Sequence, residues 1–144
     1  MTASQKKLVR TQRIAALETT RLNALIADVV RIDAQINARH KRMGELREVR
    51  DREFSSGRSL TVEMLSQNRV WMDGIDRTIA AIEDEVQTLH QDRSHAQQHV
   101  MEQRSRVKGL ETLIESLRFD VDSEAATEQM LIADEKALND YAGQ

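Results

Sequence analysis

The sequence contains no cysteine and no proline, and it has only five glycines, two phenylalanines, one tyrosine and one tryptophan among its 144 residues. A globular core of this size usually needs more aromatic side chains, and its turns usually contain proline and glycine. Little apolar surface can therefore be buried except along a narrow seam. The absence of cysteine leaves no disulfide and is compatible with the cytosol, without proving that location.

Long apolar runs and an excess of basic charge are also lacking. No stretch approaches the roughly 18 apolar residues of a membrane-spanning helix, and no apolar segment follows the first basic residues, as a secretory signal would require. The net charge of −3 and the isoelectric point of about 5.8 give no support for nucleic-acid binding. Phosphate-binding loops, nucleophile elbows and zinc-protease motifs are absent. We therefore expect no enzyme, no cofactor, no nucleic-acid partner and no direct insertion into a membrane.

The composition that is present, rich in alanine, glutamate, glutamine, arginine and leucine, is typical of long helices. In the first third of the chain, apolar residues follow a heptad pattern. From Leu22 onward they are spaced alternately three and four residues apart, and Arg39 is the polar exception. This first seam consists of Leu8, Ala15, Leu22, Leu25, Val29, Ile32, Ile36, Met43 and Leu46.

A second apolar series keeps one phase over about ten heptads, without an insertion or deletion. Its period of 3.5 residues predicts a left-handed coiled coil. The series consists of Leu65, Met72, Ile75, Ile79, Ile82, Val86, Leu89, Ala96, Val100, Val107, Leu110, Ile114, Leu117, Val121, Leu131 and Leu138.

One break separates the two series. Gly57 and the serines around it end the first helix, because glycine is conformationally permissive and serine competes for helical hydrogen bonds. Thr61 is the expected N-cap of the second helix, Glu63 suits its first turn, and Leu60 and Leu65 could form a hydrophobic staple. The predicted elements are a helix over 4–54, a turn over 55–61 and a helix over 62–141, within one coiled-coil domain over 1–144.

A short connection between long helices makes them antiparallel neighbours, so paired residues have a nearly constant sum of residue numbers. A sum near 118 aligns apolar residues, although a slip of one heptad would do the same. At that sum Arg39 lies opposite Ile79, and Gly44 lies level with Gly74. Two glycines at one level could let the coil bend or admit a partner; they could equally be independent, tolerated glycines.

The two predicted helices differ in length, at roughly 75 and 120 Å for about 50 and 80 residues. The N-terminus of the first helix should lie level with residues 112–117 of the second helix. Beyond that point an acidic segment has nothing in the chain to pack on, so it frays or is covered by another protein. Its apolar members are Phe119, Val121, Met130, Leu131, Ile132, Leu138 and Tyr141.

His95, His99 and Glu102 have a spacing that can ligate a metal on one helix face. A two-helix coil offers no enclosed interior and no further ligands there. Solvated histidines are the expected state, and no metal site is predicted.

Three stretches of the chain resemble the FliJ/YscO family, the coiled-coil proteins of flagellar and virulence type III export. They are the basic opening 8–18, the Ser55-Ser56-Gly57 break, and the start of the second helix, in which Trp71-Met72 precedes a regular apolar series. The resemblance implies an antiparallel hairpin like the coiled-coil shaft of a rotary ATP synthase. It also implies a non-enzymatic stalk in the cytoplasm, peripheral at the inner face of the membrane.

In that family, the end that holds both termini is thought to enter the pore of the export ATPase hexamer. The region nearer the turn is thought to contact the cytoplasmic domain of the export gate, and export chaperones are further partners. The resemblance therefore makes Lys6, Lys7, Arg10 and Arg13 the candidate ATPase-binding residues, and Met43, Leu46, Arg50, Trp71 and Ile75 the candidate gate-binding residues. The chain departs from the family in lacking aromatic residues on the first helix of the gate-binding region.

Two other functions remain open at this point. The chain could be a structural or scaffold coiled coil that pairs with a copy of itself through the second helix. It could also be a coiled-coil chaperone, although the turn lacks the alternating strands of a prefoldin-like platform.

Overall fold

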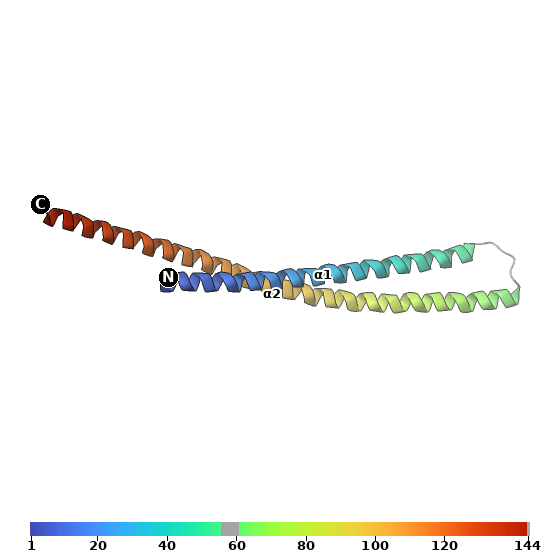
Figure 1. The fold of residues 1–144 in the computed structure, drawn as a ribbon. Helices are drawn as coiled ribbons and strands as arrows, with labels where there is room; N and C mark the ends of the chain where they lie inside the picture. The colour runs from blue at the N-terminus through green and yellow to red at the C-terminus, as the bar shows by residue number, and fades with distance from the viewer. Residues whose placement is uncertain (56–60, 144) are drawn as a thin grey trace. The chain divides into compact units, whose positions relative to one another are not determined.

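The computed structural model describes residues 1–55 and 61–143, which form two long α-helices (Figure 1). Helix α1 extends over Ala3–Ser55 and helix α2 over Val62–Ala142, so both lie within one residue of the limits expected from the sequence. The described residues contain no strand. The predicted all-α fold, two antiparallel helices of which the second is longer, is confirmed. Gly57 and Leu60, on which the expected turn and staple depend, lie outside the described residues.

At the start of both helices, backbone N–H groups donate hydrogen bonds to side-chain oxygens. At α2, the backbone N–H of Met64 donates to Oγ1 of Thr61 over 3.2 Å, and Glu63 lies in the first turn. The predicted N-cap is therefore confirmed. At α1, the N–H of Gln5 donates to Oγ1 of Thr2, and the N–H of Thr2 donates to Oε1 of Gln5. This reciprocal pair is a capping box, which the sequence analysis did not anticipate.

The chain divides into two compact units, each with a part of both helices. One unit covers Leu25–Val100. Here the α1 part runs antiparallel to the α2 part, and their apolar side chains meet in a single row. The core of this unit consists of Met43, Leu46, Ile75, Ile79, Ile82 and Val86. Every one of these residues belongs to the two predicted apolar series, so the seam follows the heptad phase read from the sequence.

The other unit combines Met1–Ala24 with Met101–Gln144. Its buried apolar residues are Ala15, Val107 and Leu117. Two polar side chains, Thr11 and Gln103, are buried beside them. Thr11 is satisfied locally, since its hydroxyl donates to the carbonyl oxygen of Lys7 over 2.8 Å.

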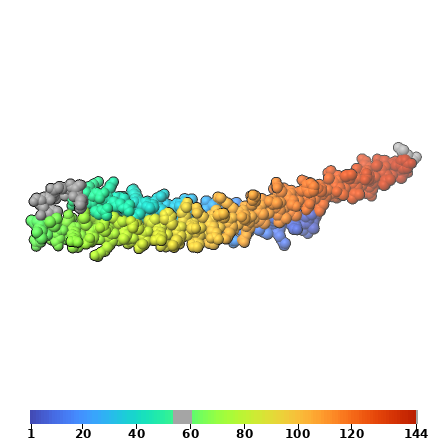
Figure 2. All heavy atoms as spheres, turned by 180° about the vertical axis from the view of Figure 1, so that it is seen from behind, coloured from blue at the N-terminus to red at the C-terminus, as the bar shows by residue number. Residues whose placement is uncertain are grey.

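In this unit, α2 extends well past the beginning of α1, as Figure 2 shows for its red C-terminal part. The hydroxyl of Ser4 donates to Glu124 over 2.7 Å, and Val121 is half-buried, whereas every described residue after Val121 is exposed. We call residues 125–142 the overhang. The sequence analysis placed the N-terminus of α1 level with residues 112–117 of α2. That prediction was wrong by about one heptad.

The same displacement applies to the register throughout both units. Residues joined across the two helices have numbers that add up to between 121 and 130, centred near 125 rather than 118. Arg39 therefore pairs with Glu85 over 2.6 Å instead of lying on Ile79, and Arg93 pairs with Asp33. A slip of seven residues leaves the apolar pattern intact, so polar partners distinguish the two registers.

The change of register also moves some residues out of the predicted alignments. Gly44 and Gly74 no longer share a level, so the predicted pair of adjacent glycines was wrong. Leu65, predicted as the first seam residue of α2, is 52% exposed. At the observed register its level lies beyond Ser55, where α1 ends.

Replacing Gly44 or Gly74 by alanine should stabilise the protein. A Cβ atom at either position would meet nothing within 4 Å, and alanine is favoured over glycine in a helix interior by about 1 kcal/mol. Because the two sites share no contact, we expect the double variant to gain about the sum of the single gains in free energy of unfolding. Urea unfolding followed by circular dichroism measures this. A loss of stability in either single variant would contradict the open surroundings of that glycine.

Candidate protein-binding surfaces

Four basic side chains lie along the N-terminal part of α1, on the unit formed by Met1–Ala24 and Met101–Gln144. Lys6, Lys7, Arg10 and Arg13, the candidates named from the sequence, are all exposed. None of them forms an ion pair with any residue of the described part of the chain. Lys6, Arg10 and Arg13 are spaced four and three residues apart, so they project from one face of the helix.

Exposed apolar groups lie among the basic side chains. Leu17 is 72% exposed and Ile14 is 42% exposed. Together these side chains line a shallow hollow on the helix surface. We call this surface the basic face, and it consists of Met1, Lys6, Val9, Arg10, Arg13, Ile14 and Leu17. Exposed apolar groups among charges of one sign are typical of a surface that binds another protein.

The overhang presents a second exposed surface, of opposite charge. Its large apolar side chains, Met130, Leu131, Ile132, Leu138 and Tyr141, are all at least 59% exposed. Residues 125–142 carry four acidic side chains and one lysine. The sequence analysis predicted an unpartnered segment at this end, because the two helices are of unequal length, but it began the segment too early and included Val121, which is half-buried.

A polar layer interrupts the apolar seam of the same unit, next to the basic face. The amide of Gln103 donates to the backbone carbonyl of Glu18 over 2.9 Å and also to the Glu18 carboxylate. The guanidinium groups of Arg21 and Arg106 lie 3.5 and 3.8 Å from that carboxylate. Sequence reasoning missed this cluster. The signal was present, because Gln103 follows Val100 by three residues and precedes Val107 by four, which is a seam position.

The surroundings of Glu18 stabilise its charged form. The hydrogen bond from Gln103 lowers the pKa of Glu18 from its ordinary value of 4.5; Arg21 and Arg106 add to this effect, while partial burial opposes it. A carboxyl group whose pKa is lowered by folding stabilises the fold above the unfolded-state value, and this contribution is lost as the pH falls through the folded-state value. Glu18 should therefore contribute to stability at neutral pH but not in strong acid.

Replacement of Glu18 by glutamine should lower the melting temperature at pH 7, and the difference from the unmodified protein should shrink as the pH falls well below 4.5. Circular dichroism melting over a pH series measures this difference. Glu111→Gln is the matched control, because Glu111 is exposed and has no hydrogen bond or ion pair to the described residues. A Glu18→Gln deficit that stays constant from neutral to acid pH would contradict the role assigned to the carboxylate charge.

Most of the residues proposed for gate contact are buried in the unit Leu25–Val100. Met43, Leu46 and Ile75 are 4%, 9% and 8% exposed and belong to the apolar core. The sequence assigned them both to the seam and to a partner, and their side chains cannot pack in the seam and against a partner at once. Their burial leaves Arg50 and Trp71 as the candidates that another protein could reach.

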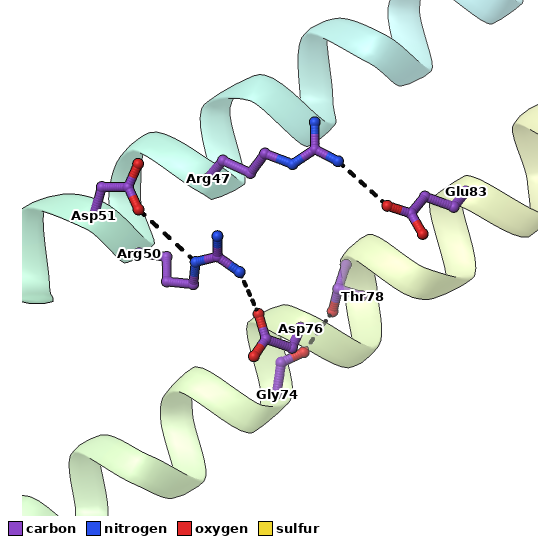
Figure 3. Close-up of polar contacts among 7 residues, drawn as sticks. All are labelled: Arg47, Arg50, Asp51, Gly74, Asp76, Thr78 and Glu83. Atoms are coloured by element: carbon purple, nitrogen blue, oxygen red, sulfur yellow. Dashed lines mark hydrogen bonds and ion pairs between the residues drawn. The ribbon is translucent and has the colours of Figure 1, made fainter.

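Arg50 and Trp71 are on different helices of this unit. Nη1 of Arg50 donates to Asp76 over 2.8 Å, and its Nε lies 3.9 Å from Asp51, as Figure 3 shows. The hydrogen bond to Asp76 raises the pKa of Arg50 above its ordinary value. Trp71 is 41% exposed and follows Val70, which is 70% exposed. Tryptophan and arginine are both enriched at binding hot spots.

Among the described residues, no three histidine, cysteine, aspartate or glutamate side chains come close enough to hold a metal ion, and this includes the His95 and His99 pair. No helix in the described ranges is long and apolar enough to cross a membrane. The hollow of the basic face is open to solvent along one helix.

Comparison of the chain with known protein families, with curated proteins and with solved structures finds no match.

Proposed function

We propose that the chain is a non-enzymatic stalk of a type III protein export apparatus, either flagellar or virulence-associated. In this proposal it acts in the cytoplasm at the inner face of the membrane, docks in the export ATPase hexamer and contacts the cytoplasmic domain of the export gate. Export chaperones are further candidate partners. The proposal rests on the resemblance of three sequence stretches to the FliJ/YscO family.

The structural observation that carries the proposal is the basic face. Lys6, Arg10 and Arg13 have no acidic partner within the described residues, and they lie next to apolar groups that the chain itself leaves exposed. A helix hairpin without an enclosed pocket can act on an ATPase by binding it. Opposite charge on the ATPase would increase the association rate and orient the complex.

We expect the purified chain to stimulate assembly or turnover of its export ATPase, measured as phosphate release. Reversing three charges, with Lys6→Glu, Arg10→Glu and Arg13→Glu, should weaken binding by about tenfold or more, because attraction becomes repulsion at the contact. The effect of the unmodified chain should decrease as salt is raised.

The matched control reverses the same number of basic residues elsewhere. Lys41, Arg69 and Arg77 are exposed and form no ion pair with the described residues, so their replacement by glutamate should leave stimulation nearly unchanged. Equal losses in the two triple variants would show that net charge, rather than the basic face, governs the effect. No stimulation by the unmodified chain would count against the ATPase role.

Contact with the export gate should depend on Trp71. Trp71→Ala is expected to weaken binding of the gate's cytoplasmic domain by about 2 kcal/mol or more, as is typical of a tryptophan hot spot. Isothermal titration calorimetry measures the change. Val70→Ala is the control, because Val70 is adjacent and more exposed. If the two variants bind equally well, Trp71 is a flanking residue of the coil and not a contact.

A further inference from the structure

We propose that two copies of the chain associate end to end, with the overhang of each copy lying on the basic face of the other. Both surfaces belong to the same compact unit, so the inference requires only the arrangement within that unit. It concerns the chain alone and goes beyond the proposed export role.

The overhang has an apolar stripe that needs a partner. Leu131, Leu138 and Tyr141 are spaced seven and three residues apart, which places them on one side of α2. Each of them is at least 63% exposed. A helical segment of this length is only marginally stable in water unless its apolar side is packed, and no α1 residue is level with it. The apolar residues of the basic face, Ile14 and Leu17 among them, are exposed in the same way.

The charges of the two surfaces are complementary. Residues 1–17 carry four basic side chains and no acidic ones, whereas the overhang, residues 125–142, carries four acidic side chains and one basic. The overhang makes no ion pair with the rest of the described chain. A second copy supplies both signs at once, because each copy brings one acidic overhang and one basic face.

The lengths of the two surfaces also match. The overhang, residues 125–142, is about 27 Å long, and the segment from Met1 to Leu17 is about 24 Å, at 1.5 Å per residue. In a twofold-symmetric pair the α2 helices of the two copies are antiparallel, so each overhang runs parallel to α1 of the other copy. The contact is then made twice and closes on itself, which limits assembly to a dimer.

One consequence is that the dimer covers Lys6, Arg10 and Arg13. Self-association and any other partner of the basic face would then exclude each other. The dimer would be a reserve form of the chain, and a partner that bound the basic face more tightly would dissociate it.

Sedimentation equilibrium of the full chain tests this inference. We expect a monomer–dimer equilibrium that shifts toward monomer as salt is raised. The face variant (Lys6→Glu, Arg10→Glu, Arg13→Glu) and the overhang variant (Asp134→Lys, Glu135→Lys, Asp140→Lys) should each be monomeric at concentrations where the unmodified chain is dimeric. Circular dichroism verifies that both variants remain helical.

Mixing the two variants provides the decisive measurement. In the mixture an acidic overhang meets a basic face and a basic overhang meets an acidic face, so a one-to-one dimer should form again. The control variant, with Lys41, Arg69 and Arg77 replaced by glutamate, should dimerise like the unmodified chain. A monomer at all concentrations, a dimer unaffected by either charge reversal, or failure of the mixture to dimerise would overturn the inference. None of these outcomes bears on ATPase stimulation, which is measured separately.

Discussion

The structure depends on one row of apolar contacts between two helices. Met43, Ile79 and Val86 in one unit and Ala15, Val107 and Leu117 in the other are buried because they project toward the facing helix at heptad spacing. Two helices alone leave no second layer, so an apolar residue outside this row remains at the surface. Such residues are abundant in this chain, and they gather on the basic face, around Trp71 and on the overhang. The narrow core thus explains the number of exposed apolar groups.

A strictly periodic seam has a weakness, which is that it fits equally well after a shift of seven residues. The apolar series could not distinguish an alignment in which the numbers of paired residues add up to 118 from one in which they add up to 125. The polar contacts distinguish the two alignments. Only the second gives Arg39 and Arg93 carboxylate partners and lets the buried amide of Gln103 reach Glu18. Exposed ion pairs contribute little free energy each, but a buried polar side chain that must be satisfied penalises the wrong register strongly. Gln103 therefore contributes specificity at a position where leucine would contribute more burial.

The sequence predicted the helices, the cap at Thr61 and the unequal lengths, because these depend on local signals and on periodicity. It did not predict the register, since that depends on which side chains face each other across the coil. The candidate sites divide in a similar way. The exposure of Lys6, Arg10 and Arg13 follows from their positions off the seam, whereas Met43, Leu46 and Ile75 lie on the seam and were buried for that reason. Applying the heptad phase to the site residues would have separated the two groups without a structure.

The inequality of the two helices links stability to binding. Near Ser4 and Glu124 the α2 helix loses its neighbour, and from there to Ala142 its helical state receives no support from the seam. Whatever packs on the overhang contributes the missing apolar contacts, so binding and helix stabilisation at this end are one process. The basic face has the opposite character, because α1 is held in place by the seam on its other side and is ready to bind without rearrangement. A preformed basic surface and a conditionally stable acidic one, within the same unit, make this end of the chain responsive to the concentration of its partners.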